Sequence, residues 1–115
     1  MSQLADLTFL KTFTGGDKAK MSKYITMFLN GAPQILAQIR QQTDAADWKA
    51  LKTSSHSLKT QLKYMGIASA VELAFTIEQQ CGDLKDMENV PELTARLENE
   101  TNAAISELRE ELTKL

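Results

Sequence analysis

Residues 48–66 read WKALKTSSHSLKTQLKYMG, and the order of apolar, small and basic side chains in this stretch decides the fold. One set of side chains recurs every three or four positions and consists of Trp48, Leu51, Ser55, Leu58, Leu62 and Met65. This spacing places the whole set on one stripe of an α-helix and is typical of the seam of a helical bundle. Gly66 follows, and a glycine at this place commonly ends a helix. We therefore expect a helix from about residue 46 to residue 65 that buries one face.

The rest of the chain repeats its apolar residues at the same interval, and only two prolines and five glycines interrupt it. The other expected helices are a short first one that contains Leu4, Leu7 and Leu10 and ends before Thr14, a second from Asp17 to about Gln42, a fourth over about residues 69–81 and a last one that starts near Pro91. The loops between these expected helices are short, and short loops make consecutive helices antiparallel neighbours. The sequence thus predicts an all-α fold, an antiparallel up-down four-helix bundle with a short additional N-terminal helix, in one domain over residues 1–115.

Helix ends are predicted from single residues. Asp17 suits the N-cap of the second helix, and Ser69 with Glu72 has the spacing of a capping box for the fourth. Gly82 is expected to end that fourth helix. Pro33 lies inside the second helix and must kink or split it. A kink is favoured because the apolar register resumes unchanged after the proline.

Composition excludes several classes of protein. Among 115 residues, 43% are apolar and 24% are charged, which is too apolar for a disordered chain and too charged for a membrane protein. No apolar run approaches the roughly 20 residues of a membrane span, and the first thirty residues do not resemble an export signal. A cytoplasmic location is expected. One cysteine and one histidine allow neither an internal disulfide nor a four-ligand zinc site, so Cys81 is interpreted as a small buried hydrophobe.

Charge is unevenly distributed along the chain. The net charge of −2 gives no reason to expect nucleic acid as a partner. Residues 48–71, however, carry four lysines and no acidic residue. One position along from the buried stripe, these lysines and the one histidine form a second row, which consists of Lys49, Lys52, His56, Lys59 and Lys63. A step of one residue turns about 100° around a helix, so this row should lie on the exposed flank.

His56 is the chemically distinctive member of that row. Neighbouring cations disfavour the imidazolium form and leave a lone pair on a ring nitrogen near neutral pH. The same cations attract a phosphoryl group, which brings about two negative charges. Lys59, together with Lys63, is therefore expected to hold a phosphoryl group against His56, which would act as a nucleophile.

The antiparallel fourth helix should supply a partner for His56. Ten residues separate His56 from Gly66, about 15 Å of helix, and a helix that returns from Ser69 reaches the same depth at about residue 78 or 79. Glu78 would accept the Nδ1 proton of His56 and leave Nε2 as the nucleophile. An error of one residue in the turn would place Gln79 there instead.

These residues resemble the histidine-containing phosphotransfer (HPt) domains of multistep phosphorelays and chemotaxis kinases. Such domains carry, on one bundle helix, a small residue, the phosphoacceptor histidine, any residue, leucine, lysine and glycine, with another glycine ten positions after the histidine. Here the stretch reads Ser55, His56, Ser57, Leu58, Lys59 and Thr60, followed by Gly66. The resemblance implies that Lys59 helps to hold the phosphoryl group and that Glu78 contacts the ring. Thr60 departs from the usual glycine, which affects how closely a partner can approach.

The resemblance also implies a function. The chain would carry a phosphoryl group on His56 to and from aspartates of response-regulator receiver domains, in a relay fed by a histidine kinase, with Mg²⁺ bound by the receiver. The sequence has no glycine-rich phosphate loop, so we expect a monomeric carrier with no ATP site and no cofactor of its own, rather than an enzyme. The expected docking surface centres on Ser55, Lys59, Thr60 and Lys63, with Lys52 and Gly66 as further candidate binding residues and apolar residues of the second helix at its rim.

Simpler interpretations remain open beside these. The lysine row is also compatible with an ordinary solvated face, and Glu78 with a boundary residue. Trp48, Phe28, Phe75 and the methionines are interpreted as core. A rival function is a non-phosphorylated helical adapter that binds a receiver or another signalling protein by shape. A di-iron bundle enzyme is excluded, since it needs a histidine on each of two helices.

Overall fold

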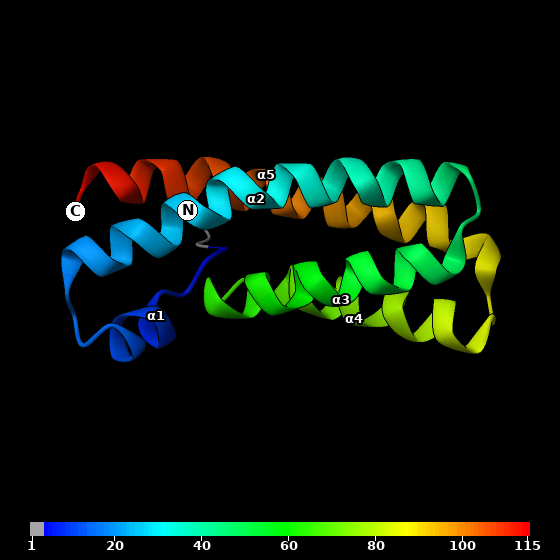
Figure 1. Cartoon of the computed structure of the whole chain (residues 1–115), viewed down its shortest axis with the longest axis horizontal. Coiled ribbons are helices and arrows are strands. Elements are labelled where there is room, and N and C mark those ends of the chain that lie inside the picture. Colours follow the sequence, from blue (N-terminus) through cyan, green and yellow to red (C-terminus); the bar gives the residue numbers. More distant parts are fainter. Residues whose placement is uncertain (1–3) are drawn as a thin grey trace.

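The computed structural model describes residues 4–115, and this part of the chain is all-α. Its elements are α1 (Thr8–Phe13), α2 (Lys18–Asp44), α3 (Trp48–Tyr64), α4 (Ala68–Asp83), the short 3-10 helix η1 (Met87–Asn89) and α5 (Val90–Thr113). Figure 1 shows α2 and α5 as one pair of antiparallel helices that lies against a second pair, α3 and α4. The short α1 lies under the start of α2, in line with the end of α3 (Figure 1). The predicted fold class is confirmed.

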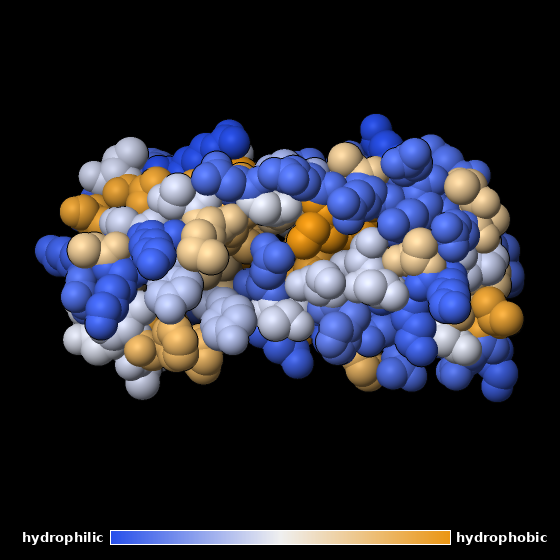
Figure 2. Space-filling model, in the orientation of Figure 1, coloured by the Kyte–Doolittle hydropathy of each residue, from blue (hydrophilic) through white to orange (hydrophobic). Residues whose placement is uncertain are grey.

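The core lies along the axis of a bundle that measures 42 × 23 × 22 Å. The predicted stripe of α3 points into it, since Leu51, Leu58 and Leu62 have no exposed surface and only Trp48, at the helix start, is half-buried. The other helices contribute large, fully buried side chains that include Ile25, Ile39, Ile77, Leu97 and Leu108. On the face drawn in Figure 2 hydrophilic residues predominate and apolar residues lie in scattered groups, as expected for a bundle that buries its apolar stripes.

Some helix ends follow the prediction. Asp17 caps α2 by accepting hydrogen bonds from the backbone N–H groups of Ala19 and Lys20 at 2.9 and 3.2 Å. The helix is continuous through Pro33, so the proline does not split it. Pro91 lies in the first turn of α5, where the absence of an N–H costs nothing.

Other ends differ from the prediction. The first helix begins at Thr8, so that Leu4 and Leu7 precede it. Ser69 forms no capping box, because its hydroxyl donates to Glu100 of α5 at 2.5 Å. Gly82 does not end α4 either; the helix continues to Asp83, and Leu84 takes the left-handed conformation with φ 54°.

Hydrogen bonds from residues 4–6, called the N-terminal clamp below, tie the start of the chain to α5 and to the α3–α4 turn. The carboxylate of Glu107 on α5 accepts the backbone N–H groups of Leu4 and Ala5 at 2.8 and 3.1 Å. The N–H of Asp6 donates to the carbonyls of Met65 and Gly66 in the α3–α4 turn. Gly66 has φ +65°, and a Cβ there would stand 2.0 Å from the carbonyl oxygen of Asp6. Only glycine fits this turn, because any side chain would displace the N-terminal segment.

Candidate functional site

The lysine and histidine row of α3 lies on the outside of the bundle. The His56 side chain is 60% exposed, and Lys49, Lys52 and Lys63 are also exposed. Lys59 is the exception, with only 12% of its side chain accessible to solvent. The position of the row follows from its one-residue offset from the buried stripe.

Glu78 of α4 lies opposite His56 and Lys59 and binds both. Its Oε2 is 2.7 Å from Nδ1 of His56, and its Oε1 is 2.6 Å from Nζ of Lys59. Partial burial acts to raise the pKa of Glu78, but the hydrogen bonds from Lys59 and His56 and their charges outweigh it, so the pKa lies below the ordinary value. Glu78 is therefore a carboxylate at neutral pH and holds two groups of α3 at once.

The contact with Glu78 fixes the state of the His56 ring. A carboxylate only accepts hydrogen bonds, so Nδ1 must carry the proton that it donates. In the neutral ring Nε2 then keeps its lone pair. An oriented, exposed imidazole with a free lone pair can attack an electrophile from solution.

Phe75 is the second residue of α4, after Glu78, that contacts the ammonium group of Lys59. Nζ of Lys59 lies 5.2 Å from the centroid of the Phe75 ring, within the range of a cation–π contact. The prediction that Phe75 belongs to the core is wrong, because its side chain is 47% exposed. Its sequence signal was an aromatic residue three positions before Glu78, which places both on one side of α4.

Of the predicted binding residues, Ser55 does not lie on the site surface, whereas Gly66 lines the groove beside Lys59 and Lys63. Ser55 has no exposed surface, and its hydroxyl oxygen has no hydrogen-bond partner within residues 4–115. It cannot contact a docking protein, since it belongs to the buried stripe of α3. Gly66 lies in the α3–α4 turn beneath Asp6, where it serves the N-terminal clamp.

The remaining predicted residues surround His56 at the surface. Thr60 is exposed and donates its hydroxyl hydrogen to the carbonyl of His56 at 3.2 Å. The Lys52 side chain passes over Gly82 of α4, where an added Cβ would meet its Nζ at 3.3 Å. Lys63 lies one turn beyond Lys59, in the wall of a groove.

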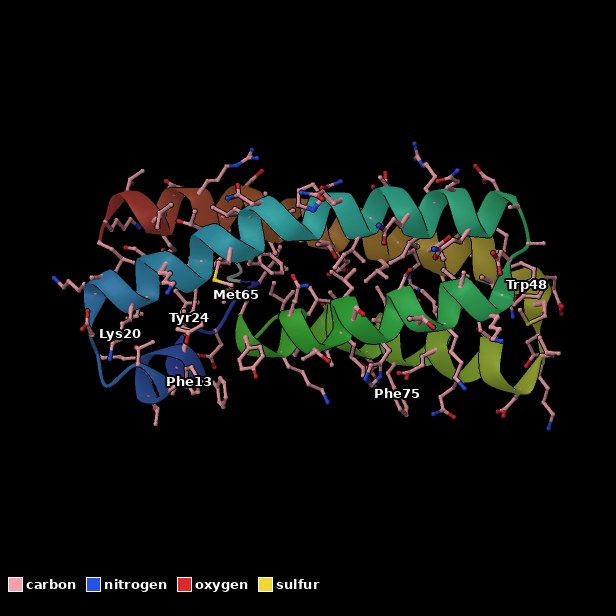
Figure 3. All side chains as sticks on the ribbon, viewed as in Figure 1. Phe13, Lys20, Tyr24, Trp48, Met65 and Phe75 are labelled. Atoms are coloured by element: carbon pink, nitrogen blue, oxygen red, sulfur yellow. The ribbon has the colours of Figure 1, made fainter. Side chains whose placement is uncertain are left out.

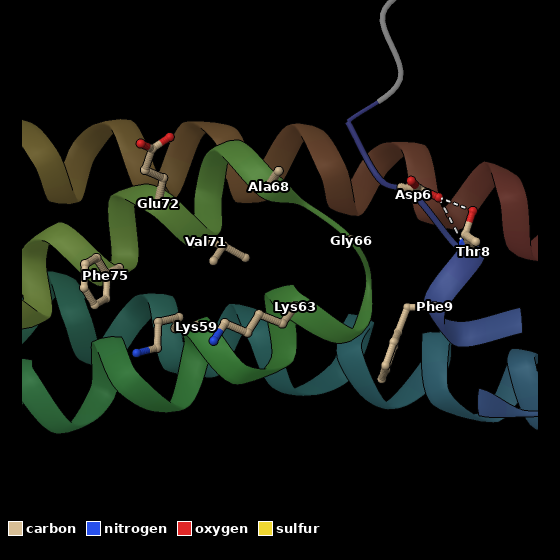
Figure 4. A pocket seen from close by; sticks show the side chains of 10 residues that line it. All are labelled: Asp6, Thr8, Phe9, Lys59, Lys63, Gly66, Ala68, Val71, Glu72 and Phe75. Atoms are coloured by element: carbon tan, nitrogen blue, oxygen red, sulfur yellow. Dashed lines mark hydrogen bonds between the residues drawn. The ribbon is translucent and has the colours of Figure 1, made fainter. Parts of the chain in front are cut away.

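That groove runs between α3 and α4 and has a volume of about 840 Å³. In Figure 4, Lys59 and Lys63 line it from α3, Val71 and Phe75 line it from α4, and Phe9 of α1 stands at its far end. The sequence did not indicate this groove, since its lining combines residues of α3 and α4 with Asp6, Thr8 and Phe9 from the start of the chain.

An aromatic cluster fixes α1 in that place. Its members are Phe9 and Phe13 of α1, Tyr24 of α2 and Tyr64 of α3. Figure 3 shows Phe13 and Tyr24 facing each other, and their ring centroids are 5.5 Å apart. Phe9 and Phe13 remain 52% and 54% exposed, so the cluster also adds apolar surface to this end of the molecule.

Neither a metal-binding cluster nor a membrane-spanning helix is found in the described part of the chain. It contains no group of three or more His, Cys, Asp or Glu side chains placed to hold a metal ion. Among residues 4–115 no helix combines the length and the hydropathy that a membrane span requires. Cys81 is buried, and this burial raises the pKa of its thiol.

The fold and sequence are similar to known proteins. The family model described as "Hpt domain" matches residues 23–115. The crystal structure of histidine-containing phosphotransfer protein B from Pseudomonas aeruginosa superimposes with a TM-score of 0.86 at 18% sequence identity, covering 100% of this chain and 99% of that one. No curated protein sequence matches this chain. The prediction of one domain over residues 1–115 stays a prediction.

Proposed function

The chain belongs to the Hpt domain family and is a histidine phosphotransfer protein of a phosphorelay, and we propose that His56 is the residue that carries its phosphoryl group. One observation supports this assignment above all. The ring of His56 is 60% exposed, and its Nδ1 lies 2.7 Å from a carboxylate oxygen of Glu78. His56 is also the one histidine of the sequence.

The transfer follows from the state of the ring. Nε2 of His56 attacks the phosphorus of a receiver's aspartyl phosphate, so that an N–P bond forms while the acyl P–O bond breaks and the aspartate leaves as a carboxylate. The ring keeps its Nδ1 proton, and the positive charge that develops on it faces Glu78. Transfer to the next receiver reverses these bond changes. Glu78 is thus a positioning residue, and it stabilises the charged ring.

Lys59 is proposed to hold the phosphoryl oxygens. It lies one helical turn after His56, and its ammonium group has three N–H donors. One donor is used by Glu78 at 2.6 Å, which leaves the others for a phosphoryl group on the neighbouring ring. Lys63 extends the positive charge by a further turn.

We propose receiver domains and a histidine kinase as the partners, with Mg²⁺ bound by the receiver and no ATP site in this chain. The docking surface is proposed to centre on His56, Lys59, Thr60 and Lys63, with Lys52 at its edge. Thr60, which stands where the family usually has glycine, sets how closely a partner can approach. We also propose a cytoplasmic location, because the phosphoryl groups of a relay derive from ATP inside the cell. The protein is further proposed to be a monomer.

Labelling with a phosphorylated receiver and Mg²⁺ tests the assignment. The purified chain should acquire an acid-labile, base-stable label, and His56→Gln should abolish it. Ser57→Gln places the same side chain one exposed position away and should label as the parent does.

Equal labelling of His56→Gln and the parent would refute the carrier role of His56. If the parent takes no label but binds the receiver, and His56→Gln binds equally well, the protein is an adapter instead.

A further inference from the structure

Lys59 is far more enclosed than its neighbour in the site. Its side chain is 12% exposed, whereas that of His56, one turn earlier on the same helix, is 60% exposed. The ion pair with Glu78 accounts for one side of this enclosure. The second side is the Phe75 ring, whose centroid lies 5.2 Å from Nζ of Lys59.

The position of Phe75 is not explained by burial in the core. Its side chain is 47% exposed at the wall of the groove between α3 and α4. Figure 4 shows Lys59 on α3 and the Phe75 ring on α4 at the same end of the groove. Phe75 and Glu78 stand three residues apart, on one side of α4, so one helix supplies both the carboxylate and the aromatic face.

We propose that Phe75 is a positioning residue for phosphoryl transfer, because its ring holds the Lys59 ammonium group against Glu78 and beside His56. This inference rests on the proposed role of His56. A lysine side chain has a flexible four-carbon stem, so an unsupported ammonium group would occupy many positions. An aromatic face attracts the cation without taking a hydrogen-bond donor from it, and therefore orders Lys59 while its remaining N–H groups stay available for phosphoryl oxygens.

A double-mutant cycle separates this role from direct contact with a partner. Phosphoramidate serves as the phosphoryl donor, so that no protein partner is present, and the initial rate of phosphohistidine formation is measured on the full chain. Phe75→Leu should lower this rate about two- to fivefold, the range that corresponds to a cation–π contact at an exposed site. In a Lys59→Ala background the same substitution should change the rate by a factor close to one, because the group that Phe75 positions is gone.

Rescue and spectroscopy supply readouts that a merely structural role would not change. Phe75→Tyr and Phe75→Trp keep an aromatic face and should retain the parental rate, and Gln79→Ala, at the exposed position next to Glu78, should retain it too. In the unmodified protein the ε-methylene protons of Lys59 should resonate upfield of those of the other lysines, because they adjoin an ammonium group that lies over the Phe75 ring. Phe75→Leu should abolish that displacement, and Phe75→Met provides a second variant should the leucine protein fold poorly.

Two results would overturn the inference: the same rate factor in both backgrounds, or Lys59 protons at ordinary positions in the unmodified protein. The His56→Gln protein distinguishes these from failure of the proposed function. If His56→Gln takes no label while the cycle is additive, only the role of Phe75 is wrong. If His56→Gln still takes label, the assignment of His56 is wrong, and the NMR measurement still tests the contact between Lys59 and Phe75.

Discussion

Replacing Glu78 by glutamine should destabilise the protein by about 1–2 kcal/mol at pH 7. Hydrogen bonds to charged groups contribute about 1.5–3 kcal/mol each when both partners are shielded from water. The bond to Lys59 meets this condition, since the two side chains are 12% and 15% exposed. The bond to His56 is discounted to about 0–1 kcal/mol because that ring is largely solvated. Glutamine keeps one acceptor oxygen, so part of the stabilisation by these two hydrogen bonds is retained.

The loss of unfolding free energy in Glu78→Gln should depend on pH, which tests the role of the Glu78 charge directly. The pKa of Glu78 is lower in the folded protein than its ordinary value of 4.5. A carboxylate with a depressed pKa contributes stability that is fully present above the unfolded-state pKa and is lost as pH falls through the folded-state pKa. Urea unfolding should therefore separate the parent from Glu78→Gln at pH 7, and the two free energies of unfolding should converge towards pH 3.

Glu72→Gln is the matched control, because it makes the same chemical change at an exposed position on the same helix. It should alter stability by less than about 0.5 kcal/mol. A Glu78→Gln protein as stable as this control at pH 7 would show that the ion pair of Glu78 with Lys59 does not stabilise the fold. A difference between parent and Glu78→Gln that is the same at pH 3 as at pH 7 would show that the charge of Glu78 is not responsible for it.

Two further predictions concern Lys59 and Gly66. Lys59→Ala should slow phosphoryl transfer about tenfold, the equivalent of one charge-assisted hydrogen bond, and should raise the pKa of Glu78 in an NMR titration; an unchanged pKa would contradict the contact. Gly66→Ala should cost about 2–4 kcal/mol in urea unfolding, because its Cβ would displace the Asp6 backbone as well as strain the turn, whereas Gly16→Ala, at φ +78° with open space around it, should cost only about 1 kcal/mol. Equal losses for the two glycine variants would show that the close approach at Gly66 is unimportant.

Much of the site could be predicted because helix geometry is regular. The stripe of α3 fixed which side chains face the core, and a shift of one residue placed His56 outside. The rise of 1.5 Å per residue and a short turn placed residue 78 or 79 opposite His56, and the structure shows that Glu78 is the partner. The prediction succeeded because both helices are uninterrupted between the turn and the site.

The features that the sequence did not reveal depend on neighbours distant in the chain. Ser69 has the spacing of a capping box, yet Glu100 of α5 competes for its hydroxyl. Gly82 resembles a helix stop, yet α4 continues past it to Asp83, and the Lys52 side chain of α3 passes alongside it. Phe75 is apolar, and its place three residues before Glu78 does not by itself show that it faces a lysine of α3 rather than the core. Helix propensity describes how a residue behaves within its own segment, whereas the contacts of these three residues are made with another helix.

The proposed phosphoryl site lies on two helices as two pairs at i and i+3, His56 with Lys59 and Phe75 with Glu78. Such an arrangement could be transferred to another protein. A designed antiparallel helical hairpin of the same register would need only these four side chains to reproduce the environment of the imidazole. The distance from the connecting turn, and not the identity of the remaining surface, would decide whether the graft succeeds.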